Sequence, residues 1–308
     1  MQKHVQSDQL VAGPPATATL RDRIRLMRPS HWIKNVFVFA PLVFGKALTD
    51  AGRVEAALMT FAAFCLVSSS VYILNDIADR HADAEHPKKR FRPIASGRIG
   101  VASAIIQLIL LVAVSAFFVL QLPWQAMACI ALYAVLNLGY SMGLKHVVLV
   151  DIFIIAAGFM LRVLAGAEAV QVEASQWLVI CTLFLSLFLA VAKRRSEINH
   201  IGRGESRRVL DDYTPELVRL IMNVSVAGSI MSYTLYTVSD HAHRYFNTDK
   251  LIYTVPIVMY GIFRYLYLDE KQQTAENPVS VILRDPWLIA TGVAWAAAAI
   301  AVIYLERL

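Results

Sequence analysis

Residues 61–94 read FAAFCLVSSSVYILNDIADRHADAEHPKKRFRPI, and this stretch joins an apolar run to a dense group of charges. Residues 61–74 carry no charge, and a second apolar run, VASAIIQLILLVAVSAFFVL, follows at residues 101–120. A helix of about 20 apolar residues spans the ~30 Å hydrocarbon core of a bilayer. The stretch therefore predicts two membrane-spanning helices joined by a charged connection outside the bilayer.

The composition of the whole chain agrees with this prediction. The 308 residues are 57% hydrophobic and have a mean hydropathy of +0.53, which is too apolar for an ordinary soluble domain. Cys65, Cys129 and Cys181 lie inside apolar runs, a position typical of small buried hydrophobes and not of a disulfide framework. We expect an all-α polytopic membrane protein. Its net charge of +6 is interpreted through its distribution over the loops, and no nucleic-acid partner is expected.

Nine segments are expected to cross the membrane as helices, and the first is the weakest because it contains Lys34, Asn35 and Pro41. The nine are residues 32–49, 54–76, 101–120, 123–142, 147–168, 176–193, 216–238, 251–268 and 286–305. Residues 1–27 are expected to form a flexible or amphipathic cytoplasmic segment, and residues 28–308 a nine-helix membrane domain. The oligomeric state stays open, with a homo-oligomer as one alternative.

Lysine and arginine are distributed unevenly over the connections between these segments. Most lie in residues 21–28, 77–100, 193–208 and 271–284, whereas the other face has Lys46, Arg53, Arg244, Lys250 and Arg307. Short cytoplasmic loops of membrane proteins carry the excess of these two residue types. We therefore expect a multi-pass protein of the cytoplasmic (inner) membrane, with its N-terminus and the stretch 75–94 facing the cytoplasm.

The acidic part of the opening stretch has helical spacing. If the preceding helix continues past residue 75, then Asn75, Asp79 and Asp83 lie on one face, with Asp76 close to it. Like charges at this spacing repel each other unless they are solvated or neutralised by a cation. Mg²⁺ usually takes one or two carboxylates and shares the rest of its shell with phosphate and water. A solvated loop is the alternative, but the NDxxDxxxD pattern at a membrane boundary favours a magnesium site.

The segment VYILNDIADRHAD resembles the first aspartate-rich motif of the UbiA superfamily of intramembrane prenyltransferases. That resemblance covers the chain from about Arg28 to its end. It implies nine helices around a cavity that opens to the cytoplasmic surface and to lipid. It also implies that Asn75, Asp76, Asp79 and Asp83 hold a Mg²⁺–diphosphate.

A second feature narrows the resemblance. UbiA proteins typically carry another acidic motif, DxxxD, after the sixth helix, whereas this chain reads AVAKRRSEINH there. Bases can hold an anionic phosphate directly through charge-assisted hydrogen bonds. Together with RPSHWIKNVFVFAPLVF, HPKKRFRPIASG, YSMGLKHVVLVDIF and LRVLAG, this segment is similar to the decaprenyl-phosphate phosphoribosyltransferase branch. The resemblance implies transfer of 5-phosphoribose from phosphoribosyl diphosphate to a polyprenyl phosphate.

Both substrates of such a reaction are polyanions, so several bases are expected beside the metal. The residues expected to bind the donor phosphates or ribose are Lys89, Arg90, Arg92, Lys145, Asp151 and Arg162. Those expected at the acceptor phosphate are Lys34, Lys193, Arg194 and Glu197. The bases at 89, 90 and 92 match the HPxKRxRPI motif of the branch, and a charge at 162, inside a span, should face a polar cavity or a partner. Plain anchoring at the membrane surface is the alternative for Lys34 and Lys145.

No general base is assigned, because the acceptor phosphate oxygen is already anionic. Catalysis would come from positioning and from stabilisation of charge. Two alternatives remain. A conventional UbiA-type prenyltransferase acting on an aromatic acceptor predicts the second acidic motif, and a lipid-phosphate transporter or flippase predicts ionisable residues near the membrane midplane.

Overall fold

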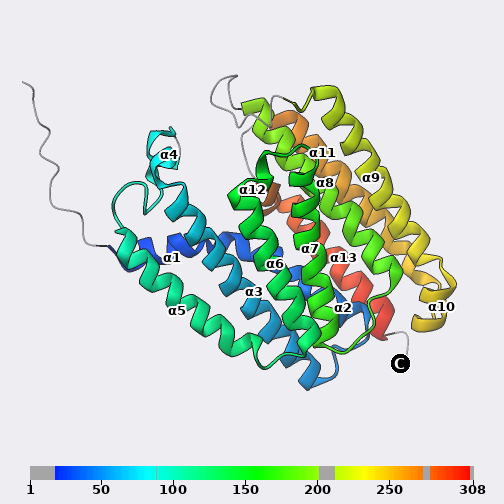
Figure 1. The fold of residues 1–308 in the computed structure, drawn as a ribbon. Helices are drawn as coiled ribbons and strands as arrows, with labels where there is room; N and C mark the ends of the chain where they lie inside the picture. Colours follow the sequence, from blue (N-terminus) through cyan, green and yellow to red (C-terminus); the bar gives the residue numbers. More distant parts are fainter. Residues whose placement is uncertain (1–17, 88, 201–211, 273–277, 306–308) are drawn as a thin grey trace, which may run out of the picture.

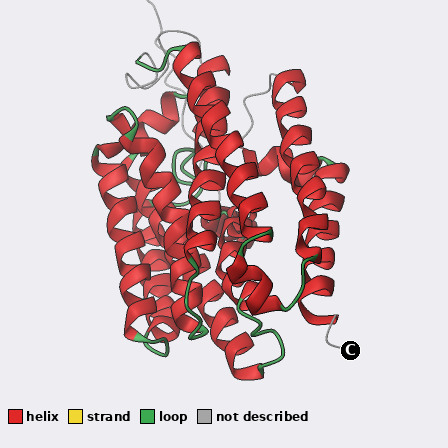
Figure 2. Ribbon diagram, turned by 90° about the vertical axis from the view of Figure 1, so that its right-hand side faces the viewer, coloured by secondary structure: helices red, strands yellow, loops and turns green. Residues whose placement is uncertain are grey.

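The fold is a bundle of long helices, several of which run from one end of the molecule to the other (Figures 1 and 2). The computed structural model describes residues 18–87, 89–200, 212–272 and 278–305, and these ranges contain helices and turns but no β-strand. Eight of the described helical segments are long and apolar enough to cross a membrane. They are α3 (Ala51–Ala78), α5 (Val101–Val119), α6 (Trp124–Met142), α7 (Val150–Ala169), α8 (Gln176–His200), α9 (Pro215–Thr237), η5 with α11 (Lys250–Thr254 and Val255–Gln272), and α13 with η6 (Pro286–Ile300 and Ala301–Leu305).

These eight segments agree closely with the expected spans from 54–76 to 286–305, which confirms the all-α polytopic membrane class. Shorter helices connect or flank them. These are α1 (Leu20–Met27), η1 (Pro29–Phe39), α2 (Ala40–Phe44), α4 (Arg80–Glu85), η2 (Lys89–Phe91), η3 (Leu144–His146), α10 (Asp240–Phe246) and α12 (Pro278–Arg284). Figure 1 shows α4 beyond one end of the bundle and α10 at the other end.

The first expected span, 32–49, has a different form from the other eight. It consists of the 3₁₀ helix η1 and the five-residue helix α2, so the structure does not confirm a ninth long helix among the described residues. Arg28 before it adopts a left-handed backbone, with φ 53°, and Pro29 begins the new helix in a changed direction. Pro41 then lacks the N–H that would continue the hydrogen-bond ladder. These features explain why this segment does not form one regular α-helix.

The described part of the expected N-terminal segment is an ordered helix. Thr19 and Asp22 form a capping box at the start of α1, in which each side chain bonds the other's backbone. Leu26 is fully buried and packs with Ile73 of α3 and Ile94. Helix α1 therefore packs against the bundle. The expected division into residues 1–27 and 28–308 stays a prediction, and residues 1–17 lie outside the described ranges.

Candidate active site

The acidic stretch is divided between two helices. Helix α3 ends at Ala78, Asp79 caps it, and α4 begins at Arg80. The expectation that Asn75, Asp79 and Asp83 share the face of one continuous helix is therefore not met. The break instead brings Asp76, near the end of α3, into reach of the same cation as Asp83 on α4.

That cation is the guanidinium group of Arg92. Its Nη1 lies 3.1 Å from Asp76 Oδ1 and 2.5 Å from Asp83 Oδ2. Arg28 also donates to Asp76 Oδ1 at 2.5 Å. Both carboxyl groups are almost completely buried, while the two arginines are partly exposed. We call Asp76, Asp83, Arg28 and Arg92 the acid cluster, and Lys89 lies at its edge, 4.0 Å from Asp83.

The other residues expected in the acidic motif and its basic partner lie outside this cluster. Asp79 pairs with Lys145 at 3.7 Å, which joins the end of α3 to the η3 turn. Asn75 accepts the backbone N–H of Asp79 through its own carbonyl. Arg90 is exposed, with its guanidinium over the ring of Phe91.

The acid cluster has the chemistry that a magnesium ion needs, although the donor set is smaller than expected. The carboxylates of Asp76 and Asp83 converge on one positive charge, and two carboxylates are the protein contribution that Mg²⁺ usually takes beside phosphate oxygens. Within the described ranges, no three acidic, histidine or cysteine side chains come close enough to hold a metal among themselves. The residues present therefore fit a metal completed by substrate phosphate and water.

The 3₁₀ helix η1 arranges its side chains in stripes, because residues three apart lie on the same face. One stripe contains His31, Lys34 and Phe37. The last two of these residues line a cavity of about 100 Å³ together with Lys193 of α8. We call this cavity the lysine pocket. An α-helix would have placed these three residues on a wider arc.

The opposite stripe, Trp32, Asn35 and Val38, fastens η1 to its neighbours. The Trp32 indole N–H donates to Ser69 Oγ of α3 at 3.1 Å. Val38 meets α7 at Gly166, where a Cβ would lie 2.2 Å from the Val38 carbonyl oxygen, so only glycine permits this approach. This contact positions the lysine-bearing stripe.

Arg162 has the buried position that its sequence context predicts, but its partners belong to the protein. Nε donates to Asn35 Oδ1 at 2.7 Å, Nη1 to the Gly158 carbonyl at 2.6 Å and Nη2 to the Tyr133 hydroxyl at 3.0 Å. Its guanidinium also lies over the Tyr133 ring, 4.4 Å from the centroid. The structure thus gives Arg162 a fastening role between α7, α6 and η1, and does not bring it to the acid cluster.

An apolar groove of about 400 Å³ continues from the lysine pocket. The two spaces share Phe37, Leu189 and Ile282 in their walls. Farther along, the groove is lined by α8, α9, α11 and α13 and reaches Phe44 and Trp295. A long hydrocarbon chain ending in a phosphate fits this arrangement, because its head would meet two lysines and its tail an apolar wall.

Three of the expected substrate ligands pair with one another in this structure, namely Asp151, Arg194 and Glu197. Arg194 is completely buried, and its Nε lies 2.5 Å from Asp151 Oδ2 in an ion pair. Its two other nitrogens bond Glu197 and the Tyr140 hydroxyl. Tyr213 donates to Asp151 Oδ1 at 2.6 Å. Arg194 and Asp151 thus have protein partners in this structure, and their expected roles at the phosphate and the ribose stay predictions.

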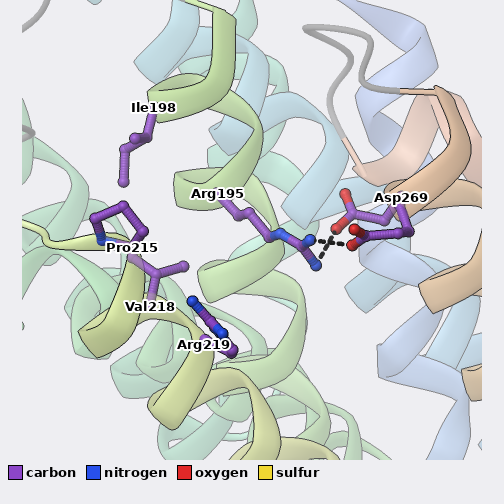
Figure 3. A pocket seen from close by; sticks show the side chains of 7 residues that line it. Arg195, Ile198, Pro215, Val218, Arg219 and Asp269 are labelled. Carbon is purple, nitrogen blue, oxygen red and sulfur yellow. Dashed lines mark hydrogen bonds and ion pairs between the residues drawn. The ribbon is translucent and has the colours of Figure 1, made fainter.

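A polar pocket of about 580 Å³ lies between α8, α9 and α11 (Figure 3). Arg195 points across it to α11, where it pairs with Asp269 at 3.0 Å and also with Glu270. None of the residues expected at the metal, donor or acceptor sites lines this pocket. The pairs of Arg195 hold α8 against α11, and we assign no substrate to this space.

Two residues of the site were not singled out from the sequence. In the sequence, Arg28 is one of many charges expected at the cytoplasmic face, and His31 lies inside the RPSHW segment with no signal of its own. The signal that was available is the Arg-Pro pair before an apolar segment, because the residue before proline avoids the α region. That pair indicates a turn, and the turn carries Arg28 to Asp76.

Comparisons with known proteins agree with the family that the aspartate-rich motif resembles. A family model described as the UbiA prenyltransferase family matches residues 38–208. The chain belongs to the UbiA prenyltransferase family. It is therefore a multi-pass integral membrane transferase, and its helical arrangement is that of other UbiA proteins.

Two UbiA relatives are similar over nearly the whole chain. The decaprenyl-phosphate phosphoribosyltransferase of Corynebacterium glutamicum is 33% identical, across 98% of this chain and 96% of that protein. The enzyme of the same name from Mycolicibacterium smegmatis is 34% identical, across 97% of each chain. A UbiA homologue from Archaeoglobus fulgidus, solved with GPP and Mg²⁺, shares the fold with a TM-score of 0.70 at 18% identity, across 92% of this chain and 99% of that one.

Proposed function

We propose that the protein transfers 5-phosphoribose from phosphoribosyl diphosphate to a polyprenyl phosphate in a magnesium-dependent reaction. The observation that carries the proposal is that η1 connects the acid cluster, through Arg28 at its start, to the lysine pocket, through Lys34. A cluster of carboxylates and arginines suits a metal-bound diphosphate, and two lysines close the head of an apolar groove. The relatives from Corynebacterium glutamicum and Mycolicibacterium smegmatis carry the name of this activity.

The chemistry balances without an added base. An oxygen of the acceptor phosphate attacks C1 of the ribose, and the bond between C1 and the diphosphate oxygen breaks. The diphosphate leaves with the electron pair of that bond, and the new bond joins C1 to the lipid phosphate. Transfer at an anomeric carbon passes through an oxocarbenium-like state, so negative groups on both sides of the sugar stabilise it.

We propose that Asp76 and Asp83 would hold the metal, with Asp79 and Asn75 reaching it only after a local rearrangement. A bound Mg²⁺ supplies positive charge that stabilises the leaving diphosphate. Arg28, Arg92 and Lys89 would bind the donor phosphates, because a metal on the two carboxylates would replace the arginines as their counter-ions. Bidentate guanidinium groups suit phosphate oxygens. Of the remaining donor candidates, Lys145 stands closest to this group through Asp79, and Arg90 is exposed beside it.

The acceptor phosphate is assigned to Lys34 and Lys193. Lys193 also lies 3.8 Å from Glu197, which orients it from the next turn of α8. Arg194 and Asp151 act behind this pair by holding α7 to α8. The apolar groove receives the first part of the prenyl chain.

We place this site at the cytoplasmic face of the inner membrane. Its basic residues belong to the connections that are rich in lysine and arginine, and such connections stay in the cytoplasm. The donor is water-soluble and would enter from that side, while the lipid would enter the groove from the bilayer.

The direct test uses purified protein in detergent or lipid with Mg²⁺, a polyprenyl phosphate and phosphoribosyl diphosphate labelled in the ribose. Label is expected in the lipid fraction, with release of one diphosphate for each sugar transferred. Consumption of a prenyl diphosphate with an aromatic acid, and no label in lipid, would identify a conventional prenyltransferase instead. Movement of the lipid phosphate between leaflets with no covalent product would identify a transporter.

A further inference from the structure

His31 lies where the acid cluster and the lysine pocket meet. Its ring is subject to the charges of Arg28 and Arg92 from the acid cluster and to those of Lys34 and Lys193 from the lysine pocket. It belongs to the same stripe of η1 as Lys34. Its position thus corresponds to the place where, under the proposed function, the transferred sugar must lie.

The ring is held firmly, but one of its polar atoms has no partner. Its edge meets Tyr72 of α3, with ring centroids 5.1 Å apart and planes at 88°. Its backbone N–H donates to the Arg28 carbonyl at 2.9 Å, directly after the left-handed residue. Nδ1 is buried and makes no hydrogen bond to any of the described residues. A buried polar atom without a partner costs about 1–3 kcal/mol, so its presence in a well-packed place calls for a ligand that satisfies it.

The surroundings of His31 determine which kind of ligand group can bond its Nδ1. Burial, followed by the charges of Lys34 and Arg28, lowers the pKa of His31 to about 3, so the imidazole is neutral at physiological pH. A neutral imidazole offers one donor and one acceptor, as a hydroxyl group does. The four cations whose charges act on the ring suit phosphate oxygens, whereas a ribose hydroxyl group suits a neutral partner such as this imidazole.

We propose that His31 binds a hydroxyl group of the transferred ribose and so positions the sugar between the leaving diphosphate and the acceptor phosphate. The proposal rests on the proposed function. It makes His31 a positioning residue that binds the sugar, while the charged residues around it bind the phosphates. It also explains why this place in a cationic site holds a histidine and not another lysine or arginine.

The test compares three donors, namely phosphoribosyl diphosphate and its 2-deoxy and 3-deoxy analogues, with the wild-type enzyme and the His31→Phe variant. Phenylalanine keeps the edge contact with Tyr72 but removes both ring nitrogens. We expect kcat/KM for the intact donor to fall about tenfold in the variant, as for the loss of one hydrogen bond. For one of the two deoxy donors, the variant and the wild type should be equal. A His31→Asn variant should recover part of the loss with the intact donor.

Stability distinguishes this role from a structural one. Replacement by phenylalanine removes an unpaired buried nitrogen, so the thermal unfolding temperature of the purified variant should stay the same or rise. His241→Phe, on the exposed side of α10 at the other end of the bundle, is the matched control and should leave the donor preference unchanged.

The outcomes separate the two proposals. An equal loss with all three donors, or a clear loss of stability in His31→Phe, would overturn the role of His31 while leaving the phosphoribosyl transfer in place. Absence of transfer by the wild-type enzyme with the intact donor would overturn the proposed function, and the assignment of His31 with it.

Discussion

At the scale of single residues, the acid cluster shows how one set of side chains can serve two states. Arg92 and Arg28 neutralise Asp76 and Asp83, which are too deeply buried to stay ionised without a partner. A metal ion would need the same carboxylate oxygens. Under the proposed function, guanidinium groups and Mg²⁺ would compete for these oxygens, and a diphosphate would favour the metal because it would give the arginines another partner.

Removal of Arg92 is expected to strengthen metal binding in the absence of substrate. In Arg92→Gln, both carboxylates lose one charged partner, and the affinity for Mn²⁺ should rise about tenfold. Mn²⁺ binding to the purified protein, followed by electron paramagnetic resonance, measures this change. Arg98→Gln, which loses an arginine paired with Asp22 away from the cluster, is the control. Weaker Mn²⁺ binding by Arg92→Gln than by the control would contradict the competition.

The lysine pocket is expected to act on the acceptor alone. Lys34→Met and Lys193→Met each keep the apolar stem of the side chain but remove a charge, and each should raise KM for the polyprenyl phosphate about tenfold, as for the loss of one charged hydrogen bond. The KM for phosphoribosyl diphosphate should change much less. Initial rates at varied acceptor concentration provide the measurement, with Lys271→Met on α11 as the control. A larger effect on the donor KM would move these lysines to the other substrate.

At the scale of secondary-structure elements, η1 decides which residues enter the site. The first expected span, residues 32–49, begins inside its sequence, PSHWIKNVFVF. The 3₁₀ form was not predictable from propensity, because long 3₁₀ helices are rare and depend on contacts along their length. Those contacts come from Ser69, Arg162 and Gly166, which lie 30 or more residues away in the chain.

The contact at Gly166 is expected to be sensitive to a single methyl group. In Gly166→Ala, the new Cβ would meet the backbone carbonyl of Val38, which cannot rotate away, so η1 must shift. We expect a loss of stability of about 1–3 kcal/mol and a larger fall in activity, because the shift also moves His31 and Lys34. Thermal unfolding and the transfer assay, run on the same preparation, test this.

The control for that variant is Gly292→Ala on α13. An added Cβ there meets no heavy atom within 4 Å, and alanine favours a helix interior over glycine. This variant should be as stable as the wild type or more so. A stable and fully active Gly166→Ala protein would show that the position of η1 does not depend on this close approach.

At the scale of the whole molecule, the lysine pocket lies at the head of the apolar groove. Several long helices of the bundle together form the wall of that groove. Helices α8, α9, α11 and α13 line the groove, and each contributes only a few residues to it. Because the groove wall is shared in this way, selectivity for a lipid bound there would depend on packing between helices.

Filling the groove is expected to affect the lipid substrate and not the soluble one. Gly292 lines the groove and has open space in front of it, so Gly292→Leu places a side chain in the path of the prenyl chain. The KM for a long polyprenyl phosphate should rise, while that for phosphoribosyl diphosphate stays the same. Val293→Leu, on the exposed side of α13, is the control. An unchanged acceptor KM would place the lipid outside this groove.

The sequence by itself determined the membrane class, eight of the spans and the identity of the acidic and basic stretches. The physical reason is that the length of an apolar run and the charge of a loop are local properties of the sequence. They decide directly whether a segment spans the bilayer and on which side a loop lies. The NDIAD motif and the KRRSE segment also indicated the type of substrate, since carboxylates suit a metal and bases suit a free phosphate.

Only the tertiary structure decided which of these residues act together. It paired Asp76 with Asp83 through Arg92, buried Arg194 against Asp151, and used Arg162 to hold η1. A charged side chain inside a span must find a partner, and sequence alone does not say whether the partner is a substrate or another helix. In this fold Arg194 and Arg162 have protein partners, whereas Lys34 and Lys193 line the pocket at the head of the groove.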